Sequence, residues 1–167
     1  SAPQAAHTDI YLNDDGSVDD EAHRRNHRSV GVPGTVAGLH NALERFGTLT
    51  LAEVIAPAID LAAEGIILDH DTASAINSRS DLLTRYDQTA AIFFKTDGSQ
   101  YRTGDLFQQP ELASTLRQIA TGGVEAFYNG PIADLIVAEM QRGNGLITKA
   151  DLAAYSPKER QPVRGEY

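Results

Sequence analysis

The strongest constraint on the fold of this chain is the stretch Gly31-Val32-Pro33-Gly34-Thr35-Val36-Ala37-Gly38-Leu39. It predicts a turn that leads directly into a helix, because proline suits a first helical position, where its missing N–H is not needed. Gly34 and Gly38 lie four residues apart and share one helix face, which a neighbouring backbone could approach closely. Two interpretations stay open: a buried, tightly packed helix start, or an exposed helix N-terminus that holds a ligand carboxylate or phosphate.

Helical periodicity continues on both sides of Gly47, which is a suitable residue to end a first helix over 33–46. The apolar stripe of this helix consists of Val36, Leu39, Leu43 and Phe46. Thr50 and Glu53 have the spacing of a capping box and predict the start of a second helix, which ends at Gly65. Pro57 lies inside this helix and should either kink it or remove one backbone hydrogen bond. Its predicted buried stripe consists of Val54, Ile55, Ala58, Leu61 and Ala62. The short connection favours packing of the two helices as an αα-hairpin.

The rest of the chain predicts shorter elements. Asp69 can cap a helix over 70–86, residues 91–94 have a strand composition, and turns are expected at 96–99 and 103–105. Pro110 and Pro131 each begin a helix, the first ending at Gly122-Gly123 and the second at 143–145. The inward side of the second consists of Ile132, Leu135, Ile136 and Met140. Thr148 with Asp151 repeats the capping-box pattern for a last short helix.

These elements predict a mainly α fold of helical hairpins with one or two short β-hairpins. At 167 residues the chain is one domain long and can bury a core. We expect an irregular polar lead-in over 1–31, including a short strand at 10–12, then a helical body over 32–156. Residues 157–167 should begin a strand, of which 163–167 is the clearest part. A strand that stops at its first residues is expected of a chain that continues.

Bulk composition excludes several function classes. The net charge of −9 argues against a nucleic-acid partner or an anionic membrane surface. The absence of cysteine excludes disulfides, thiol nucleophiles and thiolate metal sites. No apolar run has the length of a membrane span. The sequence contains no Gly-x-Gly-x-x-Gly, Walker, His-Glu-x-x-His or Gly-x-Ser-x-Gly motif. We therefore predict no catalytic, cofactor-binding or metal-binding residue within this chain, and no cofactor.

Two clusters in the lead-in contain residue types that can bind metal ions. The acidic turn Asn13-Asp14-Asp15-Gly16-Ser17 faintly resembles a calcium loop but lacks its ligand spacing and a closing Glu, so a solvated turn is the favoured interpretation. The wider carboxylate cluster is expected to be solvated within a polar loop, and it consists of Asp14, Asp15, Asp19, Asp20 and Glu21. His23 and His27 could share a helix face, but the arginines around them disfavour a bound cation, and we predict a solvated basic patch. Those arginines are Arg24, Arg25 and Arg28.

Five stretches, in the expected order, resemble the large-subunit region of gamma-glutamyltranspeptidases. They cover residues 32–38, 43–49, 57–62, 125–130 and 145–155. The last two, Glu-Ala-Phe-Tyr-Asn-Gly and Gly-Leu-Ile-Thr-Lys-Ala-Asp-Leu-Ala-Ala-Tyr, are the most specific. Asn144 departs from the family, which often has a second glycine there, but asparagine tolerates a left-handed backbone. The resemblance covers nearly the whole chain and only part of the family protein.

The resemblance implies a segment of the αββα N-terminal nucleophile hydrolase architecture. In that family the precursor cleaves itself, and the threonine at the new N-terminus attacks the gamma-glutamyl amide with its own amine as base. This nucleophile lies beyond the position that matches Tyr167. The arginine that holds the glutamyl carboxylate lies just upstream of the position that matches Ser1. Arg24, Arg25 and Arg28 fall outside the family motif and are not substitutes for it.

The implied partners are the remainder of the large subunit, the small catalytic subunit and a small gamma-glutamyl substrate, and the implied location is periplasmic or extracellular. One alternative is a cephalosporin acylase of the same architecture, which self-cleaves and hydrolyses a glutaryl-type amide. A second alternative is a non-catalytic helical binding module with a closed core. The segment interpretation predicts instead an exposed apolar surface.

Overall fold

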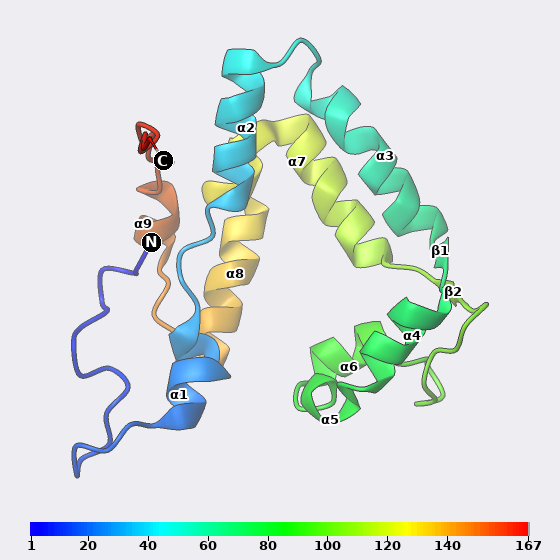
Figure 1. Cartoon of the computed structure of the whole chain (residues 1–167), viewed down its shortest axis with the longest axis horizontal. Helices are drawn as coiled ribbons and strands as arrows, with labels where there is room; N and C mark the ends of the chain where they lie inside the picture. Colours follow the sequence, from blue (N-terminus) through cyan, green and yellow to red (C-terminus); the bar gives the residue numbers. More distant parts are fainter. Residues whose placement is uncertain (167) are drawn as a thin grey trace. The chain divides into compact units, whose positions relative to one another are not determined.

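The computed structural model describes residues 1–166 and is mainly α-helical, as the sequence predicts (Figure 1). In chain order its elements are α1 (Asp20–Arg24), the 3-10 helix η1 (His27–Ser29), α2 (Thr35–Phe46), α3 (Leu51–Glu64), β1 (Ile66–Ile67), α4 (His70–Asn77), α5 (Ser80–Leu83), α6 (Asp87–Phe93), β2 (Leu106–Phe107), α7 (Pro110–Tyr128), α8 (Pro131–Arg142) and α9 (Lys149–Ala153).

The chain divides into two compact units. The first unit comprises Ser1–Glu53 and Gln118–Tyr167, and the second comprises Val54–Arg117. Tyr167 lies outside the described residues. The organisation of residues 32–156 as one helical body, and the packing of α2 and α3 as a hairpin, stay predictions.

The core of the first unit lies where α2, the end of α7, α8 and α9 meet. Its buried members are Val32, Tyr128, Ala133, Met140, Ile147 and Leu152. Val36 and Ala37 of α2 pack against this cluster, and α2 and α8 run side by side (Figure 1). This core brings together stretches that are about a hundred residues apart in the sequence.

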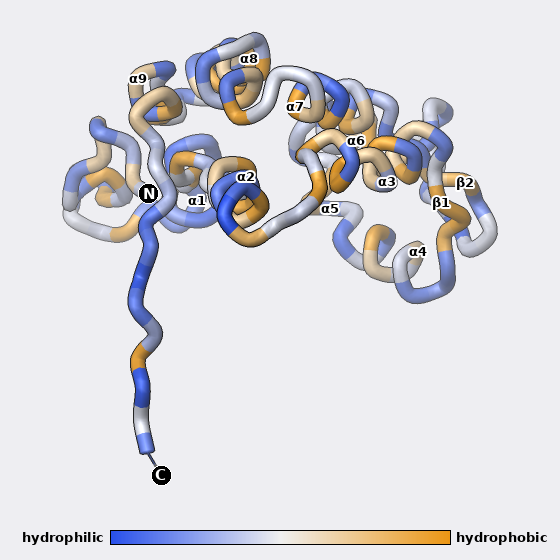
Figure 2. The backbone as a smooth tube through the Cα atoms, turned by 90° about the horizontal axis from the view of Figure 1, so that it is seen from above, coloured by the Kyte–Doolittle hydropathy of each residue, from blue (hydrophilic) through white to orange (hydrophobic). Residues whose placement is uncertain are grey.

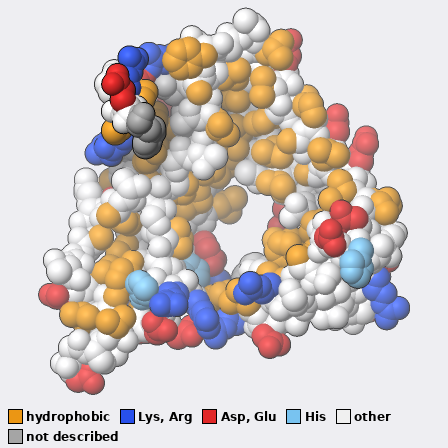
Figure 3. All heavy atoms as spheres, in the orientation of Figure 1, with side chains coloured by type: hydrophobic (Ala, Val, Ile, Leu, Met, Phe, Trp, Pro, Cys, Tyr) orange, Lys and Arg blue, Asp and Glu red, His pale blue; other side chains and the backbone are white. Residues whose placement is uncertain are grey.

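The apolar stripe of α2 is only partly covered. Val36 faces the core, but Leu39 is 67% exposed and Phe46 is 78% exposed. Figure 3 shows hydrophobic side chains at the surface around the C-terminal end of this helix. The helix begins at Thr35, two residues later than predicted, and Gly47 ends it as expected by donating its N–H to Leu43 O.

The start and end of α3 are predicted correctly, but its buried stripe is not. The Glu53 carboxylate accepts hydrogen bonds from the N–H and hydroxyl of Thr50, which completes the predicted capping box. Gly65 takes a positive φ of 86° immediately after the helix, a conformation that glycine adopts at no steric cost. Of the predicted stripe only Ala62 is buried, whereas Ile55 is half-buried and Val54, Ala58 and Leu61 are exposed.

Two predictions in the second unit are wrong. The helix expected over 70–86 is broken after Asn77, where the Ser78 hydroxyl bonds back to Ala75 O and competes with helical pairing. Residues 91–93, expected as a strand, belong to α6, since a short apolar run does not distinguish a strand from a helix. The turn at 96–99 is confirmed, with Phe94 and Gln100 forming an isolated antiparallel bridge across it.

The β-sheet is not a hairpin. β1 and β2 pair antiparallel, with Ile66 opposite Phe107 and Ile67 opposite Leu106. The pairing continues past the strands, because Leu68 N–H donates to Asp105 O and Gly104 N–H donates to Leu68 O. Leu68 is fully buried beside this sheet.

The C-terminal elements follow their predicted stops. Gly123 interrupts α7 with φ 63° and ψ −155°, so the helix consists of two pieces that divide at the predicted Gly122-Gly123. Asn144 has the left-handed φ of 54° that its side chain tolerates. Leu135 is exposed, contrary to its predicted inward position, while Ile132 and Met140 are buried.

The two ends of the chain differ from their predicted structure. The lead-in contains α1 and η1, and its predicted strand at 10–12 is reduced to one bridge between Leu12 and Val18. Residues 157–166 form no strand, since their backbone pairs with no other segment of the described chain, and Tyr167 of the predicted strand lies outside the described residues. Figure 2 shows this segment running away from α9 as an extended chain.

Candidate functional site

The N-terminus of α2 is covered by tyrosines. The Tyr128 hydroxyl accepts a hydrogen bond from Ala37 N–H at 3.3 Å and donates one to Pro33 O at 2.8 Å. Gly34, the N-cap residue, makes no side-chain cap of its own. Burial of the Tyr128 hydroxyl raises its pKa, against the opposing effect of the Ala37 N–H, so the phenol stays a neutral donor and acceptor.

Tyr155 explains why residue 34 is glycine. A Cβ at Gly34 would lie 2.0 Å from the Tyr155 hydroxyl, and the Tyr155 ring stacks on Tyr128 with centroids 5.6 Å apart. The interpretation as a buried, tightly packed helix start is therefore confirmed at Gly34 and wrong at Gly38, where a Cβ would meet nothing within 4 Å. The Ala37 N–H, which an anionic ligand at this helix start would need, is already bonded to the Tyr128 hydroxyl.

His23 and His27 are not brought together. The His23 ring makes an edge contact with Tyr11, at 5.6 Å between centroids. Arg24 and Arg25 pair with Asp20 and Glu21 one turn earlier on α1. Among residues 1–166 no group of three potential ligands could hold a metal ion.

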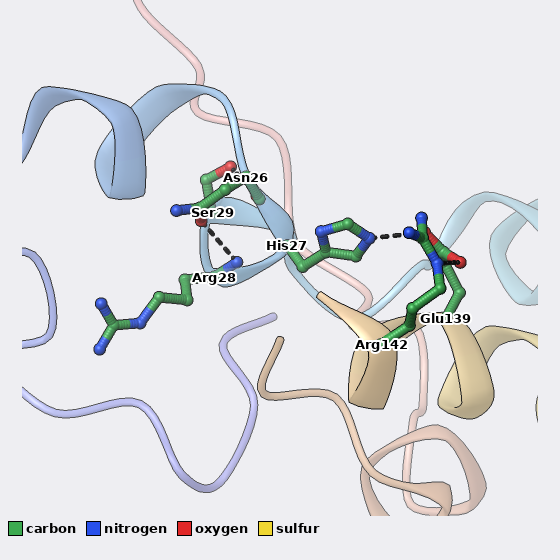
Figure 4. Close-up of polar contacts among 6 residues, drawn as sticks. All are labelled: Asn26, His27, Arg28, Ser29, Glu139 and Arg142. Carbon is green, nitrogen blue, oxygen red and sulfur yellow. Dashed lines mark hydrogen bonds and ion pairs between the residues drawn. The ribbon is translucent and has the colours of Figure 1, made fainter. Parts of the chain in front are cut away.

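The sequence suggested that His27 belongs to a solvated basic patch, and this prediction is wrong. Its side chain is only 14% exposed, and Nε2 lies 2.6 Å from Glu139 Oε1 (Figure 4). The ring fits beside two glycines that follow α8: a Cβ at Gly143 would lie 2.0 Å from Nδ1, and one at Gly145 would lie 3.0 Å from His27 Cβ. The lead-in is thereby fastened to the C-terminal end of α8.

Glu139 is held between the side chains of Arg142 and His27. Arg142 donates Nε–H to Oε2 at 2.8 Å and Nη2–H to Oε1 at 2.6 Å. These bonds, with that from His27, lower the pKa of Glu139 from 4.5 to about 2. Asn26 begins η1 by accepting the Arg28 N–H (Figure 4). The three-residue spacing of Glu139 and Arg142 on one helix indicates that these two side chains can pair. Nothing in the sequence indicates that Glu139 also contacts His27, which lies 112 positions away.

We predict a pH-dependent loss of stability for Glu139→Gln. A depressed carboxyl pKa stabilises the fold above the unfolded pKa near 4.5, and this contribution is lost as the pH falls towards about 2. At pH 7 the variant should be less stable by about 1 kcal/mol, a modest value because Glu139 is half-exposed. Urea unfolding at pH 7, 4 and 2.5 measures the difference, which should shrink in that order. A difference that stays constant contradicts the prediction.

The turn at 13–17 is exposed to solvent, as predicted, whereas Asp20 and Glu21 of the wider carboxylate cluster belong to α1 and not to a polar loop. Asp15 accepts hydrogen bonds from the hydroxyl and N–H of Ser17, which lower its pKa, and Asp19 caps α1 through the N–H groups of Glu21 and Ala22. These carboxylates satisfy local backbone donors and do not converge.

Two cavities among the described residues, one in each unit, are lined by polar side chains. In the first unit a cavity of 200 Å³ lies between α2 and the end of α7, with His40, Glu44 and Glu125 among its lining residues. The Nδ1 atom of His40 is buried there and has no hydrogen-bond partner among the described residues. In the second unit a cavity of 330 Å³ is lined by the amides of Gln88, Gln108 and Gln109 and by apolar side chains of α6 and α7.

No helix formed by residues 1–166 combines the length and the apolar character needed to cross a membrane.

Comparison with known proteins assigns this chain to a family. The family model described as gamma-glutamyltranspeptidase matches residues 1–167. The glutathione hydrolase proenzyme of Escherichia coli (strain K12) is 41% identical over 167 residues, which are 99% of this chain and 29% of that protein. The chain thus spans less than a third of the length of this curated relative.

Solved structures agree with this assignment. The gamma-glutamyltranspeptidase of Helicobacter pylori matches with a TM-score of 0.96 and 39% identity, over 99% of this chain and 48% of that chain. The cephalosporin acylase of Bacillus halodurans matches with a TM-score of 0.76 and 28% identity, over 98% of this chain and 31% of that chain. The predicted architecture, that of N-terminal nucleophile hydrolases, is the one these neighbours share. This chain belongs to the gamma-glutamyltranspeptidase family.

Proposed function

We propose that this chain is the scaffold segment of a gamma-glutamyltransferase or glutathione hydrolase. The full-length form would transfer or hydrolyse gamma-glutamyl groups of glutathione and related amides through an acyl-enzyme on an N-terminal threonine. The observation that carries the proposal is the overlap of almost the whole chain with part of the H. pylori enzyme.

Exposed apolar side chains support the role of a scaffold within a larger protein. Leu39 and Phe46 of α2, with Leu49 after it and Leu135 of α8, are all more than half exposed in the first unit. Apolar surface of this kind is usually covered by a partner. The proposed partners are the remainder of the large subunit and the small catalytic subunit of the same precursor. The alternative, a non-catalytic helical binding module, predicts a closed core instead.

The reacting groups are proposed to lie outside this segment. By the family resemblance, the threonine nucleophile follows the position of Tyr167 and the arginine for the glutamyl carboxylate precedes Ser1. We therefore assign no catalytic, cofactor-binding or metal-binding residue to the chain. A periplasmic or extracellular location is proposed on the same resemblance.

The purified 167-residue chain is expected to show no turnover of a gamma-glutamyl anilide above a heat-killed control. The full-length precursor is expected to cleave itself into two subunits. The mature enzyme should then release the aniline from the gamma-glutamyl anilide. Electrophoresis follows the cleavage, and absorbance follows the aniline. Turnover by the isolated chain would contradict the absence of catalytic residues in it. A full-length protein that matures and remains inactive on this donor would contradict the proposed activity.

The cephalosporin acylase alternative is favoured by the match to the B. halodurans enzyme, although that match is more distant than the one to the transpeptidase. A mature protein that hydrolyses a glutaryl amide and leaves the gamma-glutamyl anilide intact would establish this alternative. The two donors differ only in the α-amino group, which the glutaryl amide lacks, so they test the same amide chemistry with and without recognition of that amine.

A further inference from the structure

Asp151 is the one buried charged side chain within residues 1–166, with 6% of its surface exposed. Its two oxygens have separate partners. Oδ2 accepts the N–H and the hydroxyl of Thr148, at 2.9 and 2.6 Å, and completes the capping box of α9. Oδ1 accepts the backbone N–H of Gln4 at 2.7 Å, across 147 positions of sequence. Capping α9 therefore uses one oxygen, and the other fixes the beginning of the chain.

The other capping box of the molecule shows that a cap alone does not need this arrangement. Glu53 makes the same bonds to Thr50 at the start of α3, and its carboxylate is exposed. Burying a carboxylate is costly unless its hydrogen bonds are satisfied. Burial acts to raise the pKa of Asp151, but the bonds from Thr148 and Gln4 outweigh it, and the pKa lies below the usual value for Asp. The carboxylate is thus ionised and holds Gln4 with a charge-assisted bond.

The segment that Asp151 holds is fixed at a second point. Val32 N–H donates to Ser1 O at 2.8 Å, directly before the turn that leads into α2. Pro3 is buried, and Ala6 N–H donates to Pro3 O, which closes a turn with Gln4 at its second position. Residues 1–4 are therefore held on one side by the start of α2 and on the other by α9.

We propose that Asp151 is a positioning residue for the glutamyl site of the full-length protein. By holding Gln4, it sets the path of the chain at Ser1 and so the placement of the residues that directly precede Ser1. This inference rests on the proposed function, in which the arginine that binds the glutamyl carboxylate lies just there. Asp151 touches no substrate in this scheme and acts only through the backbone of residues 1–4.

Gln4 offers a test that leaves the Asp151 side chain unchanged. Gln4→Pro removes the N–H that Oδ1 accepts, and proline is favoured at the second position of such a turn. Gln4→Ala keeps the N–H and is the matched control. Asp151→Asn places an amide N–H₂ against one of the N–H donors, whereas Thr148→Ala weakens the α9 cap and leaves the bond to Gln4. Each variant is made in the full-length precursor, and maturation is confirmed by electrophoresis.

The expected result is a selective loss of donor binding. Gln4→Pro and Asp151→Asn should raise KM for a gamma-glutamyl anilide about tenfold, with kcat changed less than about threefold, since the lost interaction serves binding. Gln4→Ala and Thr148→Ala should leave both constants near those of the unmodified enzyme. The 4-aminobutanoyl anilide lacks the α-carboxylate, so its kcat/KM should be the same in all five enzymes.

Three outcomes would overturn the inference. One is an unchanged KM in both Gln4→Pro and Asp151→Asn. The second is an equal loss of activity on the donors with and without the α-carboxylate, which indicates general loosening of the fold. The third is the same rise in KM for Thr148→Ala, which assigns the effect to the α9 cap. Failure of the unmodified enzyme to use the gamma-glutamyl anilide is a different result and contradicts the proposed function itself.

Discussion

Leu152→Ala is expected to lower the free energy of unfolding of the first unit by about 3 kcal/mol. Leu152 is 0% exposed and is one of the two largest fully buried side chains among the described residues. It packs within the cluster that also contains Val32, Tyr128 and Met140. Truncation removes three buried carbons from this cluster and leaves a cavity that the surrounding helices can only partly fill. The loss of stability is therefore the sum of the lost transfer free energy of these carbons and the cost of the cavity.

Leu135→Ala is the matched control, because it makes the same chemical change on α8 at a side chain that is 68% exposed. It should change stability by less than about 0.5 kcal/mol. Urea unfolding followed by tyrosine fluorescence includes a signal from this unit, since Tyr128 and Tyr155 lie in it, and the second unit contributes the signal of Tyr86 and Tyr101. Equal effects of the two substitutions would show that the core is not where the structure places it.

Local signals in the sequence predicted local structure well. The two capping boxes, at Thr50 with Glu53 and at Thr148 with Asp151, act within one helical turn, and both form. Gly65 and Asn144 take the left-handed conformations that their residue types allow. In each case the sequence contains every atom that takes part, within a few residues.

Long-range contacts could not be predicted in this way. Nothing near Ile66 indicates that it pairs with Phe107, and nothing near His27 indicates that it meets Glu139. The bond between Gln4 and Asp151 is hidden for the same reason, since one partner is a backbone N–H that has no side-chain signature. These contacts depend on how helices pack, and the packing depends on the whole chain.

Periodicity identified which residues share a face but not what covers the face. Val36 and Leu39 belong to one predicted stripe of α2, yet the first packs in the core and the second is exposed. The pattern is the same for a residue that is buried by this chain and for one that awaits another partner. The proposed function would account for this difference, because it places these helices within a larger protein.

Gly143→Ala is expected to destabilise the first unit by about 2–3 kcal/mol, through a clash and not through backbone strain. The φ of Gly143 is −103°, which any L-residue adopts. A Cβ there would lie 2.0 Å from His27 Nδ1, 2.2 Å from Cγ and 2.3 Å from Cε1, so the rigid ring must move away and lose its bond to Glu139. Gly38→Ala, where a Cβ meets nothing within 4 Å, should instead stabilise α2 by about 0.5–1 kcal/mol.

A double-mutant cycle with His27→Ala separates the clash from every other effect of the alanine at position 143. Once the imidazole is absent, the added methyl group has room, so Gly143→Ala should cost less than about 0.5 kcal/mol in the His27→Ala background. The two substitutions are therefore expected to be strongly non-additive, with a coupling of about 2 kcal/mol. Additive losses would mean that His27 does not occupy the space beside Gly143, and that the lead-in is held to α8 by other contacts.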